Sequence, residues 1–165
     1  MRVFPPVVYA GGLLAGGLVQ RFWPLPIVPS GSTSLLRDGG IVVIGLTSVL
    51  ALWAVHAMRA VGTSPNPARP TTALTFAGPY RFTRNPMYLA FAVMSAGVTA
   101  VANALWPLLS VPFIVLVIQR VAIPAEERYL AAKFGPEYLA FKARVPRWLW
   151  QTEEPGPSDN GRATR

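Results

Sequence analysis

Two polar segments of this sequence carry side chains that could bind a small charged ligand. The first runs from Tyr80 to Tyr88 and contains Arg84 between its terminal tyrosines. The second contains the adjacent carboxylates Glu126 and Glu127. An arginine flanked by tyrosines offers hydrogen-bond donors for a carboxylate or a phosphate, whereas two neighbouring carboxylates suit a cationic group. The two segments therefore predict receptors for opposite charges.

Each segment also has an explanation that needs no ligand. Pro124 could begin a new helix, and Glu126 and Glu127 would then lie in its first turn, where the helix dipole favours negative charge. An arginine among tyrosines is common where a membrane span meets water, which would account for Arg84 alone. A shared site is favoured because these ionisable groups all lie beside membrane spans, where they are costly without partners, water or a function.

Composition places these residues in a membrane protein. Of the 165 residues, 52% are hydrophobic and 13% are charged, which leaves too little polar surface for a water-soluble globule of this size. Cysteine is absent and His56 is the one histidine, so disulfides, thiolate nucleophiles and multi-histidine zinc sites are excluded. The net charge of +8 suits an anionic membrane surface rather than nucleic acid, because the basic residues cluster beside hydrophobic runs.

The hydrophobic pattern predicts an all-α bundle of about four transmembrane helices. The first span runs from Val3 to Val19, and the second from Gly40 to Ala60 after a loop over residues 24 to 38 that is rich in proline, glycine and serine. The apolar stretch from Met87 to Ile123 would reach roughly 55 Å as one helix, against a hydrocarbon core of about 30 Å. It must therefore fold back, and we expect the turn at Ala102 to Pro107.

The first span has a competing interpretation as a cleavable signal peptide. Pro5 and Pro6, together with the lack of an Ala-x-Ala cleavage site, favour a helix that remains in the protein. Gly12 and Gly16 lie one helical turn apart, which predicts close helix packing rather than a specific dimer contact.

The basic residues also predict how the chain lies in the membrane. All but two of the 15, Arg21 and Arg37, fall on the side of the termini and of the proline-rich segment over residues 62 to 86, so this side should face the cytoplasm. Beyond Pro124, charged and apolar residues alternate as in an amphipathic helix pair at the membrane surface, broken at Gly135-Pro136. We expect one membrane-embedded domain over residues 1–150 and a disordered tail over residues 151–165.

The order and spacing of several motifs make a more specific case. The matching pieces are Gly78 to Tyr88, Pro124 to Leu130, Phe134 to Tyr138 and Arg144 to Arg147. Together they resemble the isoprenylcysteine carboxyl methyltransferase family and the related membrane phospholipid methyltransferases. The resemblance covers residues 78–147 and implies a pocket for S-adenosyl-L-methionine that faces the cytosol.

The resemblance also implies roles for individual residues. The ammonium and sulfonium of S-adenosyl-L-methionine suit Glu126 and Glu127, its carboxylate suits Arg84, and its adenine suits an apolar contact such as Leu130. No metal is implied. The residues expected to bind the cofactor are Tyr80, Arg84, Asn85, Pro86, Met87, Tyr88, Glu126, Glu127 and Leu130.

Two positions depart from the family's pattern. Many members have histidine where Asn85 stands, so imidazole chemistry cannot operate there, although an amide can still hydrogen-bond. The arginine that contacts substrate in the eukaryotic enzymes is replaced here by Ile123, and the nearest candidate is Arg120. Methyl transfer is a direct displacement that needs alignment and exclusion of water rather than a nucleophilic side chain. The candidate catalytic residues are thus Arg120, for substrate contact, and His56, as a base for an amine acceptor or as an interfacial side chain only.

We expect S-adenosyl-L-methionine-dependent methyl transfer to a carboxyl oxygen or an amine of a lipid-like or isoprenoid-bearing acceptor. The expected partners are this hydrophobic substrate and membrane lipids, and not nucleic acid. Two alternatives remain, a non-catalytic membrane scaffold or lipid-binding subunit and an NADPH enzyme similar to the sterol reductases. A transporter is disfavoured because the spans carry ionisable groups only near one end.

Overall fold

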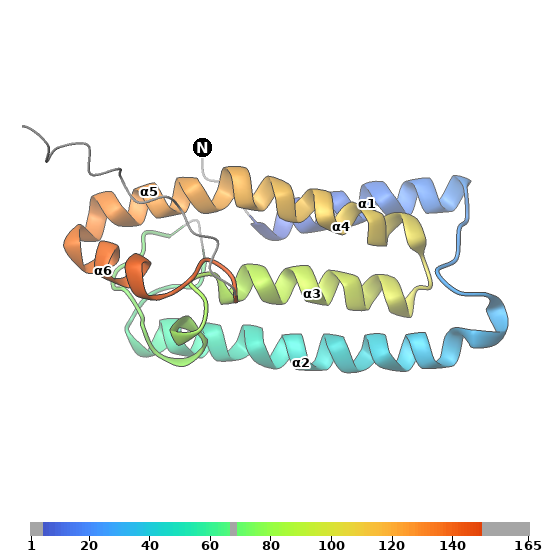
Figure 1. The fold of residues 1–165 in the computed structure, drawn as a ribbon, viewed down its shortest axis with the longest axis horizontal. Helices are drawn as coiled ribbons and strands as arrows, with labels where there is room; N and C mark the ends of the chain where they lie inside the picture. The colour runs from blue at the N-terminus through green and yellow to red at the C-terminus, as the bar shows by residue number, and fades with distance from the viewer. Residues whose placement is uncertain (1–4, 67–68, 150–165) are drawn as a thin grey trace, which may run out of the picture.

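The chain folds into helices that run along one long axis (Figure 1). The computed structural model describes residues 5–66 and 69–149, and within them no strand is present. This confirms the predicted all-α fold, and the predicted tail over residues 151–165 lies outside the described residues. The helices are α1 (Pro5–Phe22), α2 (Thr33–Ala60), α3 (Pro86–Val101), α4 (Leu105–Val117), α5 (Ile123–Phe134) and α6 (Pro136–Arg144).

The helices pack in two pairs, with α2 against α3 and α1 against α4, and α3 and α4 also touch. Glycines allow both close approaches. A Cβ atom on Gly40 would lie 2.8 Å from the carbonyl oxygen of Gly97, and one on Gly16 would lie 2.6 Å from the Cα of Pro107. The predicted close packing at Gly12 and Gly16 is therefore found within one chain, against α4.

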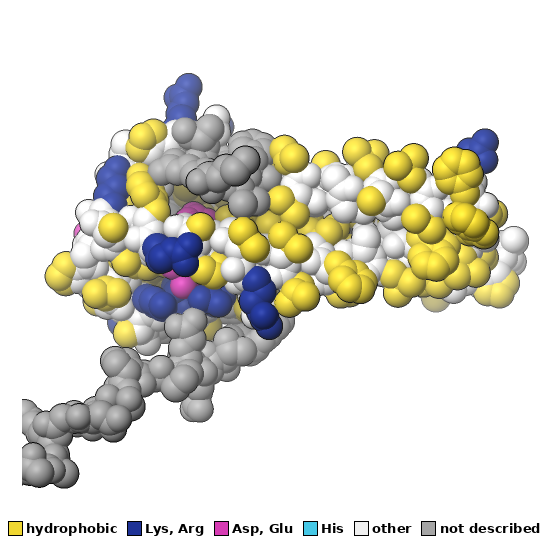
Figure 2. All heavy atoms as spheres, turned by 90° about the horizontal axis from the view of Figure 1, so that it is seen from above, with side chains coloured by type: hydrophobic (Ala, Val, Ile, Leu, Met, Phe, Trp, Pro, Cys, Tyr) yellow, Lys and Arg dark blue, Asp and Glu magenta, His cyan; other side chains and the backbone are white. Residues whose placement is uncertain are grey.

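The outside of the bundle is apolar along most of its length. Figure 2 shows hydrophobic side chains spread over the shaft and lysine and arginine side chains gathered at one end. Two helical stretches, Ser30–Ala60 and Leu105–Phe134, are long and apolar enough to cross a membrane, and α3 is apolar but shorter. An exposed apolar surface of this extent is suited to lipid rather than water. The fold is that of an all-α membrane protein, and the count of four crossings stays a prediction.

The predicted turn between the third and fourth spans is confirmed. It is built around Asn103, whose φ of 49° lies in the left-handed region that asparagine tolerates better than most residues. The Asn103 side chain also ties this turn to the loop after α1. Its Oδ1 accepts the N–H groups of Ile27 and Val28 at 3.0 Å each, and its Nδ2 donates to the Val28 carbonyl at 2.9 Å.

We expect Asn103→Ala to lower the free energy of unfolding by about 2 kcal/mol, because three hydrogen bonds are lost and alanine is strained at positive φ. Equilibrium unfolding of the purified protein in detergent measures this value. Asn103→Gly removes the same hydrogen bonds without the strain, so it should be less destabilised. Wild-type stability in Asn103→Ala would show that these contacts contribute nothing.

One predicted boundary needs correction. The loop expected over residues 24 to 38 ends early, because the 3₁₀ turn η1 (Ser30–Ser32) leads directly into α2 at Thr33. The last proline of this loop is Pro29, and the serine and threonine residues that follow it are compatible with the start of a helix. The segment over residues 62 to 86 does lack a long helix in its described part, which contains only the 3₁₀ turn η2 (Gly78–Arg81) before α3.

A second correction concerns Pro124, which does not begin a separate helix. α4 continues through a π-helical turn, η3 (Ile118–Ala122), into α5, and the N–H of Ile123 donates to the carbonyl of Ile118. A proline cannot donate the amide hydrogen that an α-helix needs, and a wider turn just before it lets the helix continue. The predicted break at Gly135 is confirmed, since its φ of 53° separates α5 from α6.

Candidate active site

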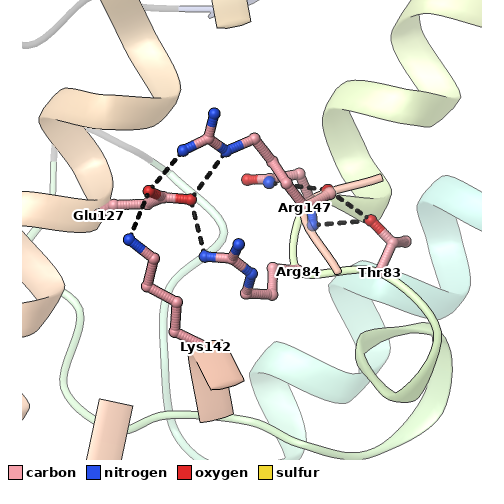
Figure 3. Close-up of polar contacts among 6 residues, drawn as sticks. Thr83, Arg84, Glu127, Lys142 and Arg147 are labelled. Atoms are coloured by element: carbon pink, nitrogen blue, oxygen red, sulfur yellow. Dashed lines mark hydrogen bonds and ion pairs between the residues drawn. The ribbon is translucent and has the colours of Figure 1, made fainter. Parts of the chain in front are cut away.

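Glu127 lies at the centre of a buried cluster of charges at the polar end of the bundle (Figure 3). Arg84 donates from Nη1 to Glu127 Oε1 at 2.8 Å. Arg147 donates from Nε to Oε1 at 3.0 Å and from Nη2 to Oε2 at 2.8 Å. Lys142 Nζ lies 3.6 Å from Oε2. We call these four residues the Glu127 cluster.

The Glu127 cluster holds more positive than negative charge in a place with little water. The side chains of Arg84 and Glu127 are 9% and 11% exposed. In addition, Arg84 Nε is buried and has no hydrogen-bond partner among the described residues. A buried donor without an acceptor is costly, and buried donors are nearly always satisfied. The Glu127 cluster therefore contains one buried donor, Arg84 Nε, whose hydrogen bond the described residues leave unsatisfied.

The chain that follows α6 crosses the start of α3, and we call residues Val145 to Trp148 the strap. The backbone carbonyl of Arg147 accepts two hydrogen bonds, from Thr83 Oγ1 at 2.9 Å and from Asn85 Nδ2 at 3.0 Å. The Arg84 N–H donates to the carbonyl of Pro146 at 2.9 Å. These bonds fix the backbone beside both arginines of the Glu127 cluster.

The strap is also anchored by packing. Trp148 is buried in the hydrophobic core with Tyr9 of α1 and Ile118 and Ile123 of the long α4–α5 helix. Asn85 is buried, and its amide group is engaged by the strap. Asn85 thus holds the strap in place, and the cofactor contact expected for it stays a prediction.

A second polar group joins three helices beside the Glu127 cluster. Tyr88 at the start of α3 donates its hydroxyl to Glu126 Oε2 at 2.7 Å. The Tyr9 hydroxyl of α1 donates to the carbonyl oxygen of Tyr88 at 3.1 Å. Burial and the charge of Glu126 raise the pKa of Tyr80 well above its usual value, so this phenol stays protonated. Glu126 itself is exposed, in contrast to Glu127.

The remaining predicted site residues lie at varied depths. Pro86 is buried in the first turn of α3, while Met87 and Leu130 are half-buried. Arg120 is exposed on η3 and His56 is exposed on α2. Over residues 5–66 and 69–149, no hydrogen bond or ion pair joins either Arg120 or His56 to the Glu127 cluster. The structure thus brings the two motif segments together. Arg120 lines a cavity that Glu127 also lines, whereas His56 is not among the described residues of that lining.

Several residues of this site lie in segments that the sequence analysis singled out, but no individual role was predicted for them. Lys142 and Arg147 complete the Glu127 cluster, and Thr83 binds the strap. Tyr138 of α6 is buried nearby, and its burial and the charge of Glu127 raise its pKa to about 12. The motif from Arg144 to Arg147 could have pointed to Arg147, because a pair of adjacent glutamates near many basic residues is expected to bind an arginine.

Comparison with known proteins agrees with this architecture. Residues 37–137, more than half of the chain, match the family described as Phospholipid methyltransferase. The fold therefore defines a class of protein, a helical membrane bundle with a charged site at its polar end. The chain belongs to the phospholipid methyltransferase family, which confirms the resemblance inferred from the motifs.

One curated relative and the solved structures complete the comparison. An uncharacterised protein of Haemophilus influenzae is 49% identical over 41 residues. The match covers 25% of this chain and 65% of that protein, so it spans less than two thirds of the relative's length. No solved structure matches the chain.

Proposed function

We propose that this protein transfers a methyl group from S-adenosyl-L-methionine to a lipid-like or isoprenoid-bearing acceptor at the cytosolic face of the membrane. One observation carries the proposal. The two motif segments meet through the Tyr88–Glu126 hydrogen bond and the Arg84–Glu127 ion pair, in a chain of the phospholipid methyltransferase family. The acceptor atom is a carboxyl oxygen or an amine nitrogen, and residues 1–150 act as one domain.

The residues present fit the cofactor's charged groups. The buried Nε of Arg84 lacks an acceptor among the described residues, and a carboxylate from the cofactor's amino acid part would supply one. Glu126, exposed and hydrogen-bonded to the neutral hydroxyl of Tyr88, suits the ammonium. Leu130 and Met87 offer apolar contact for the adenine. S-adenosyl-L-methionine, when bound, supplies a methyl group on an electrophilic sulfonium.

The protein's own contribution is alignment in a water-poor site. Glu127 holds Arg84 and Arg147 in fixed orientations through charge-assisted hydrogen bonds. Asn85 and Thr83 hold the strap over this end of the bundle, which limits access of water to the reacting groups. No nucleophilic side chain is required for a direct displacement.

The acceptor side of the site is proposed from fewer contacts. Arg120 on η3 is the arginine nearest in sequence to Ile123, and we assign it the contact with the acceptor. His56 is the base for an amine acceptor, since it is the one imidazole in the sequence. His56→Ala should then slow methylation of an amine while leaving cofactor affinity unchanged.

Calorimetry with S-adenosylhomocysteine on the purified protein tests the cofactor half of the proposal. Glu126→Gln is expected to weaken binding by about 10- to 100-fold, because a charge-assisted hydrogen bond to the ammonium is lost. Glu137→Gln is the matched control, since Glu137 is an exposed glutamate of α6 outside the site. Equal affinity in Glu126→Gln and Glu137→Gln would overturn the placement of the ammonium.

A thermal-shift titration then separates this function from its two alternatives. A ligand that binds only the folded state raises the unfolding temperature. We expect S-adenosylhomocysteine to raise it and NADPH to leave it unchanged. A shift with NADPH alone would favour a reductase, and no shift with either would favour a scaffold. Incubation with labelled S-adenosyl-L-methionine and a total lipid extract, followed by mass spectrometry, identifies the acceptor.

A further inference from the structure

A cavity lies beside the Glu127 cluster, between the long α4–α5 helix and α6. Its volume is about 430 Å³, enough for a polar headgroup rather than a single small ion. Figure 3 shows Lys142 of α6 and Arg147 of the strap reaching Glu127, and all three residues line the cavity. Arg120 and Arg128 line it from the same continuous helix as Glu127.

The charges of the lining favour an anion. Among the described residues that line the cavity, four are cations and Glu127 is the one acid. Both oxygens of Glu127 are already bonded by arginine, and Lys142 adds a third cation. In the described part of the chain, Arg120 and Arg128 have no ion-pair partner and both are exposed. The cavity therefore has cations for a ligand's negative charge and no unengaged carboxylate for a ligand's ammonium.

The position of the cavity indicates where such an anion comes from. Arg120 lies on η3 at the end of the apolar α4, next to the exposed side chains of Val117 and Val121. Leu139, which lines the cavity from α6, is exposed as well. A basic pocket at the end of an apolar helix is where lipid headgroups meet a membrane protein, with the acyl chains along the helix.

We propose that this cavity binds the phosphate of a lipid headgroup with net negative charge. Phosphatidylglycerol is a lipid of this class, whereas the headgroup of phosphatidylcholine pairs its phosphate with a cation that the lining cannot receive. The proposal goes beyond the methyl transfer proposed above, because it holds whichever molecule accepts the methyl group. The bound lipid positions α6 and the strap at the membrane surface.

The test compares two short-chain lipids on the delipidated full-length protein in neutral detergent, with binding measured by native mass spectrometry. Phosphatidylglycerol is expected to bind more tightly than phosphatidylcholine. The double variant Arg120→Gln/Arg128→Gln should lose affinity for phosphatidylglycerol by about 30-fold, from roughly 1 kcal/mol for each arginine near a lipid surface. Its affinity for phosphatidylcholine should stay the same, and added salt should weaken the wild-type preference.

Arg59→Gln/Arg144→Gln is the matched control, because both arginines are exposed, both lie outside the cavity lining, and the same charge is removed. Retained affinity for phosphatidylglycerol in this control supports the proposal. An equal loss in both double variants would overturn it, since the effect would then be one of overall charge. Equal binding of the two lipids would also overturn it. Glycerol 3-phosphate binding as tightly as the lipid would replace a lipid site with a site for soluble phosphates.

Discussion

Replacing Glu127 with glutamine is expected to lower the free energy of unfolding by about 3–5 kcal/mol, the cost of removing one partner from a buried ion pair. The carboxylate is the shared partner of Arg84, Lys142 and Arg147. The side chains of Arg84 and Arg147 are only 9% and 15% exposed, so water cannot replace the lost charge. Equilibrium unfolding in detergent micelles gives this difference directly.

Glu126→Gln provides the comparison for this result. Glu126 is the neighbouring carboxylate, but it is exposed and bonds the neutral hydroxyl of Tyr88, so its loss should cost no more than about 1 kcal/mol. The double variant Glu127→Gln/Arg147→Gln should recover part of the stability, because one of the unpaired cations is removed. Equal stability of Glu126→Gln and Glu127→Gln would contradict the role given to the Glu127 cluster.

Gly40→Val is expected to be destabilised by about 3 kcal/mol or to fail to fold. The new Cβ would lie 2.8 Å from the carbonyl oxygen of Gly97, and backbone atoms cannot swing aside as a flexible side chain can. α2 and α3 would have to separate. Their separation would displace the start of α3, which lies at the site. The measurement is again unfolding in detergent, with cofactor affinity as a second readout.

Gly45→Val is the matched control on the same helix. A Cβ atom at Gly45 meets no atom within 4 Å, and the residue is exposed. Gly45→Val therefore changes helix propensity as Gly40→Val does, but it introduces no clash. Gly45→Val should keep nearly wild-type stability. If both variants were equally destabilised, helix propensity rather than the contact with Gly97 would explain the loss.

The parts of the fold that depend on local chemistry were predictable from the sequence. Asn103 and Gly135 both take positive φ values at breaks that the pattern located, because few other residue types suit such turns. The continuous helix across Pro124 was not predictable in the same way. Its backbone is accommodated by the π-helical turn at Ile118–Ala122, and nothing in the local sequence distinguishes that turn from the start of a new helix.

The candidate site also has a part that was predictable from the sequence and a part that was not. The meeting of Arg84 and Tyr88 with the glutamate pair followed from the apolar hairpin, which returns the chain to the end where it began. The contacts of Lys142 and Arg147 with Glu127 could not be derived, because they depend on the positions of α6 and of the strap. The hydrogen bond from the Asn85 amide to the backbone of that strap could not be derived for the same reason.

The strap also determines when the site can form during synthesis. Chains emerge from the ribosome N-terminal end first, so α1 to α4 can pack before the last residues of the site have been translated. Arg147 and the carbonyl of Pro146 are the last of these groups to be synthesised. Their partners Arg84, Asn85 and Glu127 are by then already part of the bundle. A nascent chain stalled before Val145 would therefore be assembled in the membrane without a completed site, and the site would be completed only once the strap has been synthesised.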